Sequence, residues 1–254
     1  MIYIDLMSVL KKIKKSILGS YSTDIAFRYW PVIDILNKYG FVDKKILEVG
    51  SGNIGITVYY KKPVIGLDIS FDEQNDQVSS LLEKVFYDGE DFPFADNSFS
   101  LVVSVDSLEH VPPKKRLKYL KEMLRVAQEG VLLMVPTGYD SYQHDQFLSK
   151  FYFKVNQEED QFLKEHIVNG LPGREELELL LKNAGELAGK PSQLFISRSM
   201  LNLSFRKLFM RCKISHNFFL NIFYYGFLIL LPFWRYLNFG KTYRTLIFYQ
   251  IKKT

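Results

Sequence analysis

The residues whose chemistry is easiest to interpret lie between positions 46 and 55, where the chain reads Ile-Leu-Glu-Val-Gly-Ser-Gly-Asn-Ile-Gly. Gly50 and Gly52 follow a short apolar run, and glycine permits both a positive φ and the close approach of a ligand to the backbone. A second apolar run, Pro63 to Leu67, ends at Asp68. A doubly wound α/β sheet places a carboxylate for ribose hydroxyls at such a position. The spacing therefore predicts a nucleoside site.

The acid two residues before Gly50 indicates what else the nucleoside carries. Glycines that serve a dinucleotide open a helix whose N-terminus faces a pyrophosphate. Glu48 precedes the glycines here, and its carboxylate would repel phosphates. An acid at this position suits a ligand with a cationic end.

Further motifs follow in order along the chain. The stretch Asp88-Gly-Glu-Asp-Phe-Pro-Phe-Ala-Asp-Asn-Ser-Phe-Ser leads into the apolar strand Leu101 to Val105, and Asp106-Ser-Leu-Glu-His-Val-Pro-Pro comes next. Together with the glycine loop, these motifs resemble the class I S-adenosylmethionine-dependent methyltransferases, particularly the broad type 11 group. The resemblance runs from about Lys45 to Val135 and more thinly to Gly185. It implies a Rossmann-like, doubly wound, mostly parallel seven-stranded α/β sheet with an antiparallel last strand.

The resemblance also implies S-adenosyl-L-methionine as cofactor. Glu48 and the two glycines would line its methionine end, Asp68 would accept from both ribose hydroxyls, and Asp88 would meet the adenine amino group. The whole implied cofactor set is Glu48, Gly50, Ser51, Gly52, Asp68, Ile69, Asp88, Gly89, Val105 and Asp106. Two positions depart from the family pattern. Ile54 stands where many relatives carry a glycine, with Gly55 one place late, and Ser100 replaces the common Asp after Phe99.

Three histidines are candidate catalytic residues, namely His110, His144 and His166. Methyl transfer from a sulfonium depends largely on positioning, and it needs a base only when the nucleophile arrives protonated. An imidazole titrates near neutral pH and suits that task. His144 lies in the stretch Pro136 to Asp145, which we expect to be a loop after the fifth strand. His166 lies in a segment similar to one found in type 11 relatives.

The pair Glu109-His110 has three interpretations that the sequence leaves open. It could only position the loop before the helix that starts at Pro113, or His110 could act as general base. Alternatively, Asp106, Glu109 and His110 could bind a metal, since they offer hard oxygen and imidazole ligands in a pattern similar to that of quinone-pathway O-methyltransferases. No cysteine or histidine cluster has zinc spacing, and our prediction includes no metal.

Strands alternate with helices in the order expected for a parallel sheet. We expect strands at 46–49, 63–68, 84–87, 100–105 and 131–135. A final pair at 194–199 and 243–252 would run antiparallel. Expected helices cover 4–18, 23–39, a segment from Pro113 that Gly130 ends, and 175–184, which Gly185 stops. The helix at 4–18 is basic and amphipathic, which suits either packing over the pocket or a membrane surface.

An apolar insertion separates the last two strands. We divide the chain into N-terminal helices (1–44), a Rossmann-like core (45–199), this hydrophobic basic insertion (200–240) and a last core strand (241–254). The run from Phe218 to Trp234 only just reaches the length of roughly 17 residues that a spanning helix needs. A single crossing would also place the last strand on the wrong side of the bilayer. A hairpin in the membrane interface, or a lid over an apolar substrate pocket, is therefore favoured.

Charge is distributed unevenly along the 254 residues. The formal net charge is +5, yet no Asp or Glu follows Glu186, where eleven Lys and Arg occur. Such a basic, apolar end indicates an anionic partner, either membrane headgroups or nucleic acid.

One cysteine, Cys212, excludes an internal disulfide framework. With no secretory signal pattern at the N-terminus, we expect a cytoplasmic protein, peripheral on the inner face of the cell membrane.

These observations favour a methyltransferase that acts on a small-molecule or lipid-linked acceptor, with O-methylation preferred. A nucleic-acid methyltransferase is the first alternative, although the aliphatic content of the insertion argues against nucleic acid as a partner. A non-catalytic protein that binds the cofactor is the second alternative, because of the departures at Ile54 and Ser100.

Overall fold

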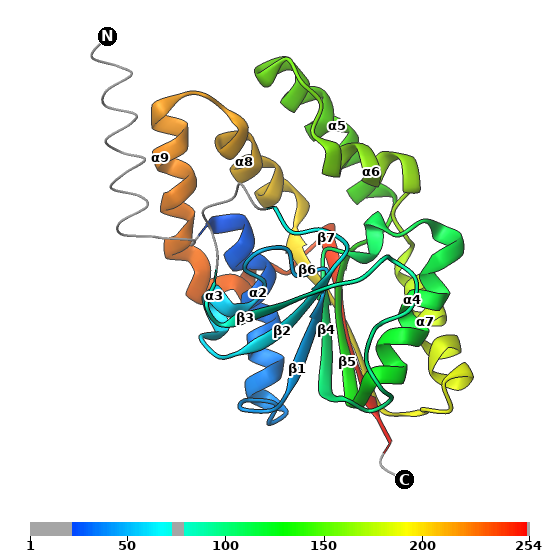
Figure 1. Cartoon of the computed structure of the whole chain (residues 1–254). Helices are drawn as coiled ribbons and strands as arrows, with labels where there is room; N and C mark the ends of the chain where they lie inside the picture. The colour runs from blue at the N-terminus through cyan, green and yellow to red at the C-terminus, as the bar shows by residue number, and fades with distance from the viewer. Residues whose placement is uncertain (1–21, 73–78, 253–254) are drawn as a thin grey trace.

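The computed structural model describes residues 22–72 and 79–252, and its centre is a seven-stranded sheet (Figure 1). The strand order is β3-β2-β1-β4-β5-β7-β6. The strands are β1 (Ile46–Val49), β2 (Val64–Asp68), β3 (Leu82–Phe86), β4 (Phe99–Val105), β5 (Ala127–Pro136), β6 (Ser192–Asn202) and β7 (Thr242–Ile251).

The first five strands are parallel, and β7 is antiparallel to both of its neighbours, β5 and β6. The predicted Rossmann-like α/β fold with an antiparallel last strand is therefore confirmed. Because the parallel strands end at one edge of the sheet, the loops after β1, β2 and β4 meet there. That edge holds most of the residues predicted to bind the cofactor.

Helices cover both faces of the sheet, as the apolar sequences of the central strands require. On one face, α4 (Pro113–Val126) and α7 (Arg174–Leu187) pack with Leu47, Val102 and Leu133. On the other face, α2 (Thr23–Lys38) packs with Val103, Met134 and other side chains of the sheet. A four-residue helix, α3 (Thr57–Tyr60), follows the glycine loop, and the short 3-10 helix η1 (Leu108–His110) follows β4.

Four helices gather beyond the carboxyl edge of the sheet (Figure 1). They are α5 (Tyr139–Asn156), α6 (Gln161–Asn169), α8 (Leu203–Ile214) and α9 (Phe218–Gly226). The 3-10 segment η2 (Phe227–Leu237) then returns the chain to β7. The segment from α8 to η2 forms most of the predicted insertion, and we call it the apolar insertion below.

The apolar insertion is anchored to α2 by buried side chains. Tyr224, Phe227 and Trp234 belong to the same core cluster as α2. The hydroxyl of Tyr224 donates to Asp24 over 2.6 Å, and the Lys213 ammonium reaches the same carboxylate at 2.7 Å. β6 and β7 pair directly, so the insertion leaves the sheet and returns to it.

Three expectations about element ends are wrong. Helix α4 ends at Val126 rather than at Gly130, which lies inside β5. Glycine is required at position 130 because a Cβ there would lie 2.8 Å from the carbonyl oxygen of Tyr249 on β7. Gly185 lies inside α7, where a side chain would collide with the Tyr249 hydroxyl. Both glycines thus serve close packing rather than helix termination. The stretch expected as a loop, 136–145, instead enters α5 at Tyr139.

The other expected elements agree with the structure to within a few residues. The predicted helix at 4–18 lies outside the described residues.

Candidate active site

The glycine loop after β1 has the backbone that the sequence predicts. Gly50 and Gly52 have φ values of +76° and +54°. A Cβ at Gly50 would collide with the Ser107 side chain of the loop after β4, whereas a Cβ at Gly52 would meet nothing within 4 Å. The first glycine therefore lets two loops touch, and the second leaves open space at the loop surface.

Glu48 points beneath this loop rather than out of it. Its side chain is fully buried, one oxygen accepts from the Tyr29 hydroxyl at 2.7 Å, and the other accepts from the Ile56 amide at 2.7 Å. A side chain at Gly55 would collide with this carboxylate, so the late glycine supports the acid. Burial and the nearby Asp68 raise the pKa of Glu48 to about 7, despite the two hydrogen bonds.

Asp68 and its neighbours form the next part of the same edge. Its carboxylate accepts from the Gly52 amide at 2.8 Å and remains partly exposed. Ile69 is 57% exposed, and Gly89 lies so near that a Cβ there would contact the Ile69 side chain at 3.6 Å. Asp88 is exposed beside them. The structure thus brings together an acid, an exposed aliphatic side chain and two glycines at this edge.

Ser51 and Val105 are buried beneath this edge. The Ser51 hydroxyl donates to the Gly52 carbonyl at 3.1 Å. Their side chains therefore support the surface that the glycines form.

Asp106 is held by two arginines. It has φ +47°, and its carboxylate accepts from the Arg244 guanidinium at 2.7 Å, with Arg28 at 3.1 Å. Although burial opposes it, the charges of Arg244 and Arg28 lower the pKa of Asp106. This carboxylate is already engaged, so it is not grouped with Glu109 and His110 as the metal interpretation of the sequence required.

A second buried network centres on Asp145 of α5. This carboxylate accepts from the Tyr243 hydroxyl at 2.7 Å and from His166 Nδ1 at 2.8 Å. Arg206 lies 3.5 Å from Asp145, stacks on the Tyr243 ring at 3.4 Å and donates to His144 Nδ1 at 2.8 Å. Burial and the charge of Arg206 lower the pKa of His144. His144 is therefore tied to a cation, whereas His166 is oriented by an acid.

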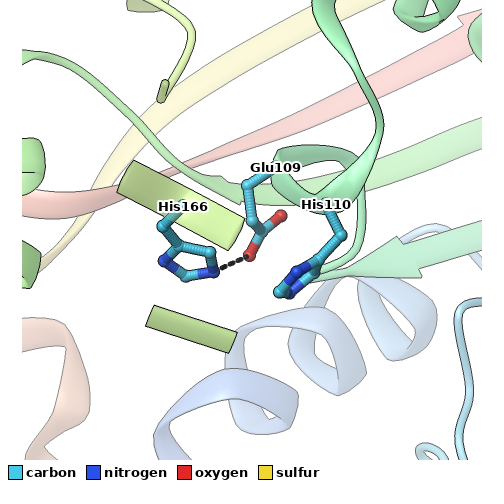
Figure 2. A group of neighbouring side chains, drawn as sticks. All are labelled: Glu109, His110 and His166. Carbon is cyan, nitrogen blue, oxygen red and sulfur yellow. Dashed lines mark ion pairs between the residues drawn. The ribbon is translucent and has the colours of Figure 1, made fainter. Parts of the chain in front are cut away.

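The third group consists of Glu109, His110 and His166 (Figure 2). Glu109 and His110 belong to η1, and His166 reaches them from α6. His166 Nε2 lies 3.7 Å from Glu109 Oε1, and the centroids of the His110 and His166 rings are 4.8 Å apart. Glu109 is fully buried, and neither of its oxygens has a hydrogen-bond partner.

The electrostatics of this group follow from burial. Burial and the nearby Asp106 raise the pKa of Glu109 to about 8. Burial and the neighbouring His166 lower the pKa of His110, although its Nδ1 lies 2.6 Å from Glu165. Burial opposes protonation of His166, but Asp145 and Glu109 raise its pKa overall. Perturbed groups of this kind at the carboxyl edge of an α/β sheet are typical of a functional site.

Comparison with known proteins identifies the domain. Residues 47–135, from β1 to β5, match the family described as the methyltransferase domain. The chain carries a class I S-adenosylmethionine-dependent methyltransferase domain. The glycine loop, Asp68 and the Glu109-His110 pair all lie inside the matched residues.

Two curated relatives of this methyltransferase domain act on different acceptor atoms. Norajmaline N-methyltransferase of Rauvolfia serpentina is 30% identical over 44% of this chain and 41% of its own length. The chloroplastic tocopherol O-methyltransferase of Arabidopsis thaliana is 35% identical over 37% of this chain and 30% of its own length. The alignments thus span less than half of either relative.

Solved structures show the same fold. A chain from Anabaena variabilis, described as a methyltransferase of an antibiotic biosynthesis pathway, has a TM-score of 0.52 and 15% identity, over 88% of this chain and 99% of that one. A methyltransferase–activator complex from Haloferax volcanii gives a TM-score of 0.50 and 14% identity, over 89% and 90%. At such identities the likeness concerns the fold alone.

The methyltransferase family and fold imply S-adenosylmethionine as the cofactor, and the loop residues fit it. Gly52 and Gly89 leave room for a ligand, and Ile69 offers an apolar surface to a base. The partly exposed Asp68 carboxylate lies beside the Gly52 amide, as a ribose would require. The individual cofactor contacts remain predictions.

Asp68→Ala should weaken the binding of S-adenosylhomocysteine by roughly 2–4 kcal/mol, because hydrogen bonds to a charged group contribute about 1.5–3 kcal/mol each and are not additive. Titration calorimetry would measure the change. Asp91→Ala is a matched control, since Asp91 is exposed and pairs only with Lys118 among the contacts described. Equal affinity in wild type and Asp68→Ala would remove Asp68 from the cofactor site.

The affinity for S-adenosylmethionine should rise between pH 6 and pH 8 and then level off. The cationic methionine end favours the ionised form of Glu48, so binding lowers its raised pKa of about 7 and releases a proton. Below pH 7 this release costs free energy, and above pH 7 the cost disappears. Calorimetry in buffers of different ionisation enthalpy would count the protons. The pH dependence should be lost in Glu48→Gln, and a flat wild-type profile would contradict the linkage.

Several residues of the site were missed by the sequence analysis. Arg28, Arg206, Arg244 and Tyr243 are all buried or engaged with acids, and Asp145 was noted only as a neighbour of His144. One sequence pattern could have revealed Arg244. It is a cation at the start of a strand that is otherwise apolar and aromatic, and such a residue needs a buried acid as partner. The other residues become neighbours only through the tertiary fold.

Proposed function

We propose that this protein transfers a methyl group from S-adenosylmethionine to an oxygen of a small-molecule or lipid-linked acceptor, at the cytoplasmic surface of a membrane. The observation that carries the proposal is the group of Glu109, His110 and His166. Glu109 and His110 follow Ser107 on the loop that approaches the cofactor loop at Gly50, and His166 joins them from α6. An acceptor hydroxyl held there would lie next to groups able to receive its proton.

In this proposal, one part of the carboxyl edge binds the cofactor and the neighbouring part binds the acceptor. When bound, S-adenosylmethionine supplies a methyl group on a sulfonium, which is an excellent leaving group. The glycine loop and Asp68 hold that cofactor in place. The side chains of η1 and α6 position the acceptor oxygen and take its proton. Burial of Glu109 and His166 strengthens the electrostatic interactions at the acceptor position.

The relatives support a small organic acceptor. One is named for N-methylation of norajmaline and the other for O-methylation of tocopherol, so domains of this kind serve both atoms. The acids and imidazoles around the acceptor position favour oxygen here, because a hydroxyl must lose a proton and a neutral amine need not do so before attack.

The apolar insertion supports a membrane surface as the place of action. By length and composition alone, Phe218–Leu237 could span a membrane, and only 22% of its most apolar window is buried. Exposed side chains on it are Phe219, Leu220, Ile222, Phe223, Ile229, Phe233, Tyr236 and Phe239. Exposed cations such as Lys207, Arg211 and Arg235 flank them. Aromatic and cationic side chains together suit the headgroup boundary.

Serine at Phe219, Phe223, Ile229 and Phe233 should release the protein from anionic vesicles while leaving S-adenosylhomocysteine binding intact. These four side chains are exposed, so their loss leaves the core unchanged. By contrast, Phe227 and Leu231 are buried, and changing them would test stability instead. Co-sedimentation with vesicles would measure binding. Serine at Leu179 and Leu187, which are exposed on α7, is the matched control.

High salt should weaken the preference for anionic over neutral vesicles, since each surface cation contributes about 1 kcal/mol within a Debye length. Absence of vesicle binding in the wild type would contradict the membrane proposal and leave the interpretation of the apolar insertion as a substrate lid.

Methyl transfer itself is tested with isotope-labelled S-adenosylmethionine and three acceptor pools. These are a total lipid extract, an aqueous metabolite extract and total RNA. We expect label in an organic-soluble or small-molecule product, and carbon NMR of that product would distinguish a methoxy group from an N-methyl group. Label confined to RNA would overturn the proposal in favour of a nucleic-acid methyltransferase.

A further inference from the structure

We infer that Glu109, His110 and His166 form a binding site for one divalent transition-metal ion. Among the described residues, they are the group of three whose ligand atoms lie close enough, all within 4.8 Å of one another (Figure 2). Two imidazoles with one carboxylate are a ligand set that suits divalent iron, cobalt, manganese or zinc. The inference deepens the proposed function, because the ion would act on the acceptor.

Both imidazoles are already oriented for metal binding. His166 Nδ1 lies 2.8 Å from Asp145, and His110 Nδ1 lies 2.6 Å from Glu165. Each Nδ1 is therefore occupied by a carboxylate, and each Nε2 is left for a metal. Metal-bound histidines commonly have such a carboxylate partner, which fixes the tautomer and increases the basicity of the ligand.

The third ligand, Glu109, has no hydrogen-bond partner. Glu109 is fully buried, yet neither carboxylate oxygen accepts a hydrogen bond. A buried acid without partners is costly, and nearly all such groups are satisfied in folded proteins. Figure 2 shows this carboxylate between the two imidazole rings. A cation at that position would satisfy Glu109 and both Nε2 atoms together.

The neighbouring acids and histidines do not compete for the ion. Asp106 is bound by Arg244 and Arg28, and His144 is bound by Arg206. A metal at either place would face an arginine charge. The site therefore consists of η1 and α6, and it differs from the set of Asp106, Glu109 and His110 that the sequence offered.

Small side-chain movements would complete the geometry. Metal–ligand bonds of about 2.0–2.2 Å require donor atoms roughly 3–4 Å apart, whereas these atoms extend to 4.8 Å. His110 can close the gap, because its side chain is 23% exposed and its partner Glu165 lies at the surface. Three protein ligands also leave coordination positions open, as in catalytic rather than structural sites.

An open position would receive the acceptor oxygen. With an ion bound, both imidazoles would serve as ligands, so the acceptor hydroxyl would release its proton to water rather than to a histidine, because a divalent ion lowers the pKa of a coordinated oxygen. The oxygen then forms a bond to the methyl carbon as the carbon–sulfur bond breaks. The sulfonium leaves as a neutral thioether.

Cobalt(II) is the probe, because its visible absorption reports coordination without turnover. The apo protein titrated with Co²⁺ should bind one ion per chain and develop visible bands. Glu109→Gln and His166→Ala should lose these bands, while circular dichroism and S-adenosylhomocysteine affinity show that both variants remain folded. No bands up to millimolar Co²⁺, or bands that persist in both variants, would overturn the inference.

A milder variant tests the site without touching its ligands or its core. Glu165→Gln should weaken Co²⁺ binding by about 10–100-fold, because Glu165 orients His110 from the surface. Glu159→Gln, an exposed acid paired with Lys164, should not change it. Unchanged Co²⁺ affinity in Glu165→Gln would exclude His110 as a ligand.

The metal inference and the proposed function can fail separately. Bound Co²⁺ in a protein that methylates none of the acceptor pools would leave the metal site and remove the proposed function. Methyl transfer that survives exhaustive chelation, in a protein that never binds Co²⁺, would do the reverse.

Discussion

His110→Ala should lower the rate of methyl transfer by about 10²–10⁴-fold, because His110 either takes the acceptor proton itself or holds the ion that acidifies the acceptor hydroxyl. His110 lies on η1 after β4, with Glu109 beside it and His166 reaching it from α6, where the proposed acceptor oxygen would lie. Its removal should leave S-adenosylhomocysteine binding nearly unchanged, because the predicted cofactor residues all precede η1, on β1 and the loops after β1, β2 and β3, and at Val105 and Asp106. Single-turnover kinetics would measure the chemical step.

His216→Ala is the matched control, since His216 is exposed on the segment between α8 and α9. It should keep the wild-type rate. A His110→Ala variant that also keeps the wild-type rate would show that proton removal does not depend on this group. A variant that loses cofactor affinity as well as rate would place His110 in the structural support of the loop.

Arg244→Met should destabilise the fold by about 3–5 kcal/mol, since it leaves a buried carboxylate without its closest cation. The Arg244 side chain is almost fully buried and holds Asp106 at 2.7 Å. Arg28 remains near this acid but is one-third exposed, so it compensates only in part. The midpoint of thermal unfolding should fall by roughly 6–20 °C for a domain of this size.

The double variant Asp106→Asn/Arg244→Met separates charge from packing. It removes both members of the ion pair, and most of the lost stability should return. Denaturant unfolding of the four proteins in the cycle gives the coupling energy. If the double variant is no more stable than Arg244→Met, then Arg244 acts through its aliphatic packing rather than through its charge.

The fold was largely predictable because local patterns and tertiary structure agree. The apolar runs at β1 and β2 end at Gly50 and Asp68, so the sequence itself marks where each strand stops. Errors occur where a glycine serves packing rather than a turn. Gly130 approaches the Tyr249 carbonyl and Gly185 approaches the Tyr249 hydroxyl, and no local pattern shows that this distant residue will lie there.

The site was predictable only in part, for a related reason. Gly50, Gly52 and Asp68 share one edge because the sheet topology places them there. By contrast, the partners of Asp106 come from α2 and β7, and the partners of His166 come from α5 and η1. These pairs span up to 138 residues of sequence. Residue spacing indicates the structure of one helix or strand at a time, so it cannot predict contacts between side chains that are distant in sequence.

The position of β7 between β5 and β6 constrains the order of folding. β7 follows every other strand in the chain, yet it separates two of them, so β6 has no neighbour in the sheet until β7 inserts. Arg244 enters the site with this strand. During synthesis, Asp106 would therefore have no ion pair with Arg244 until the apolar insertion and β7 have left the ribosome. Long-range pairing of this kind forms slowly and leaves apolar surface exposed meanwhile. A nascent chain would thus carry its most apolar segment complete while the carboxyl edge of its sheet is still open.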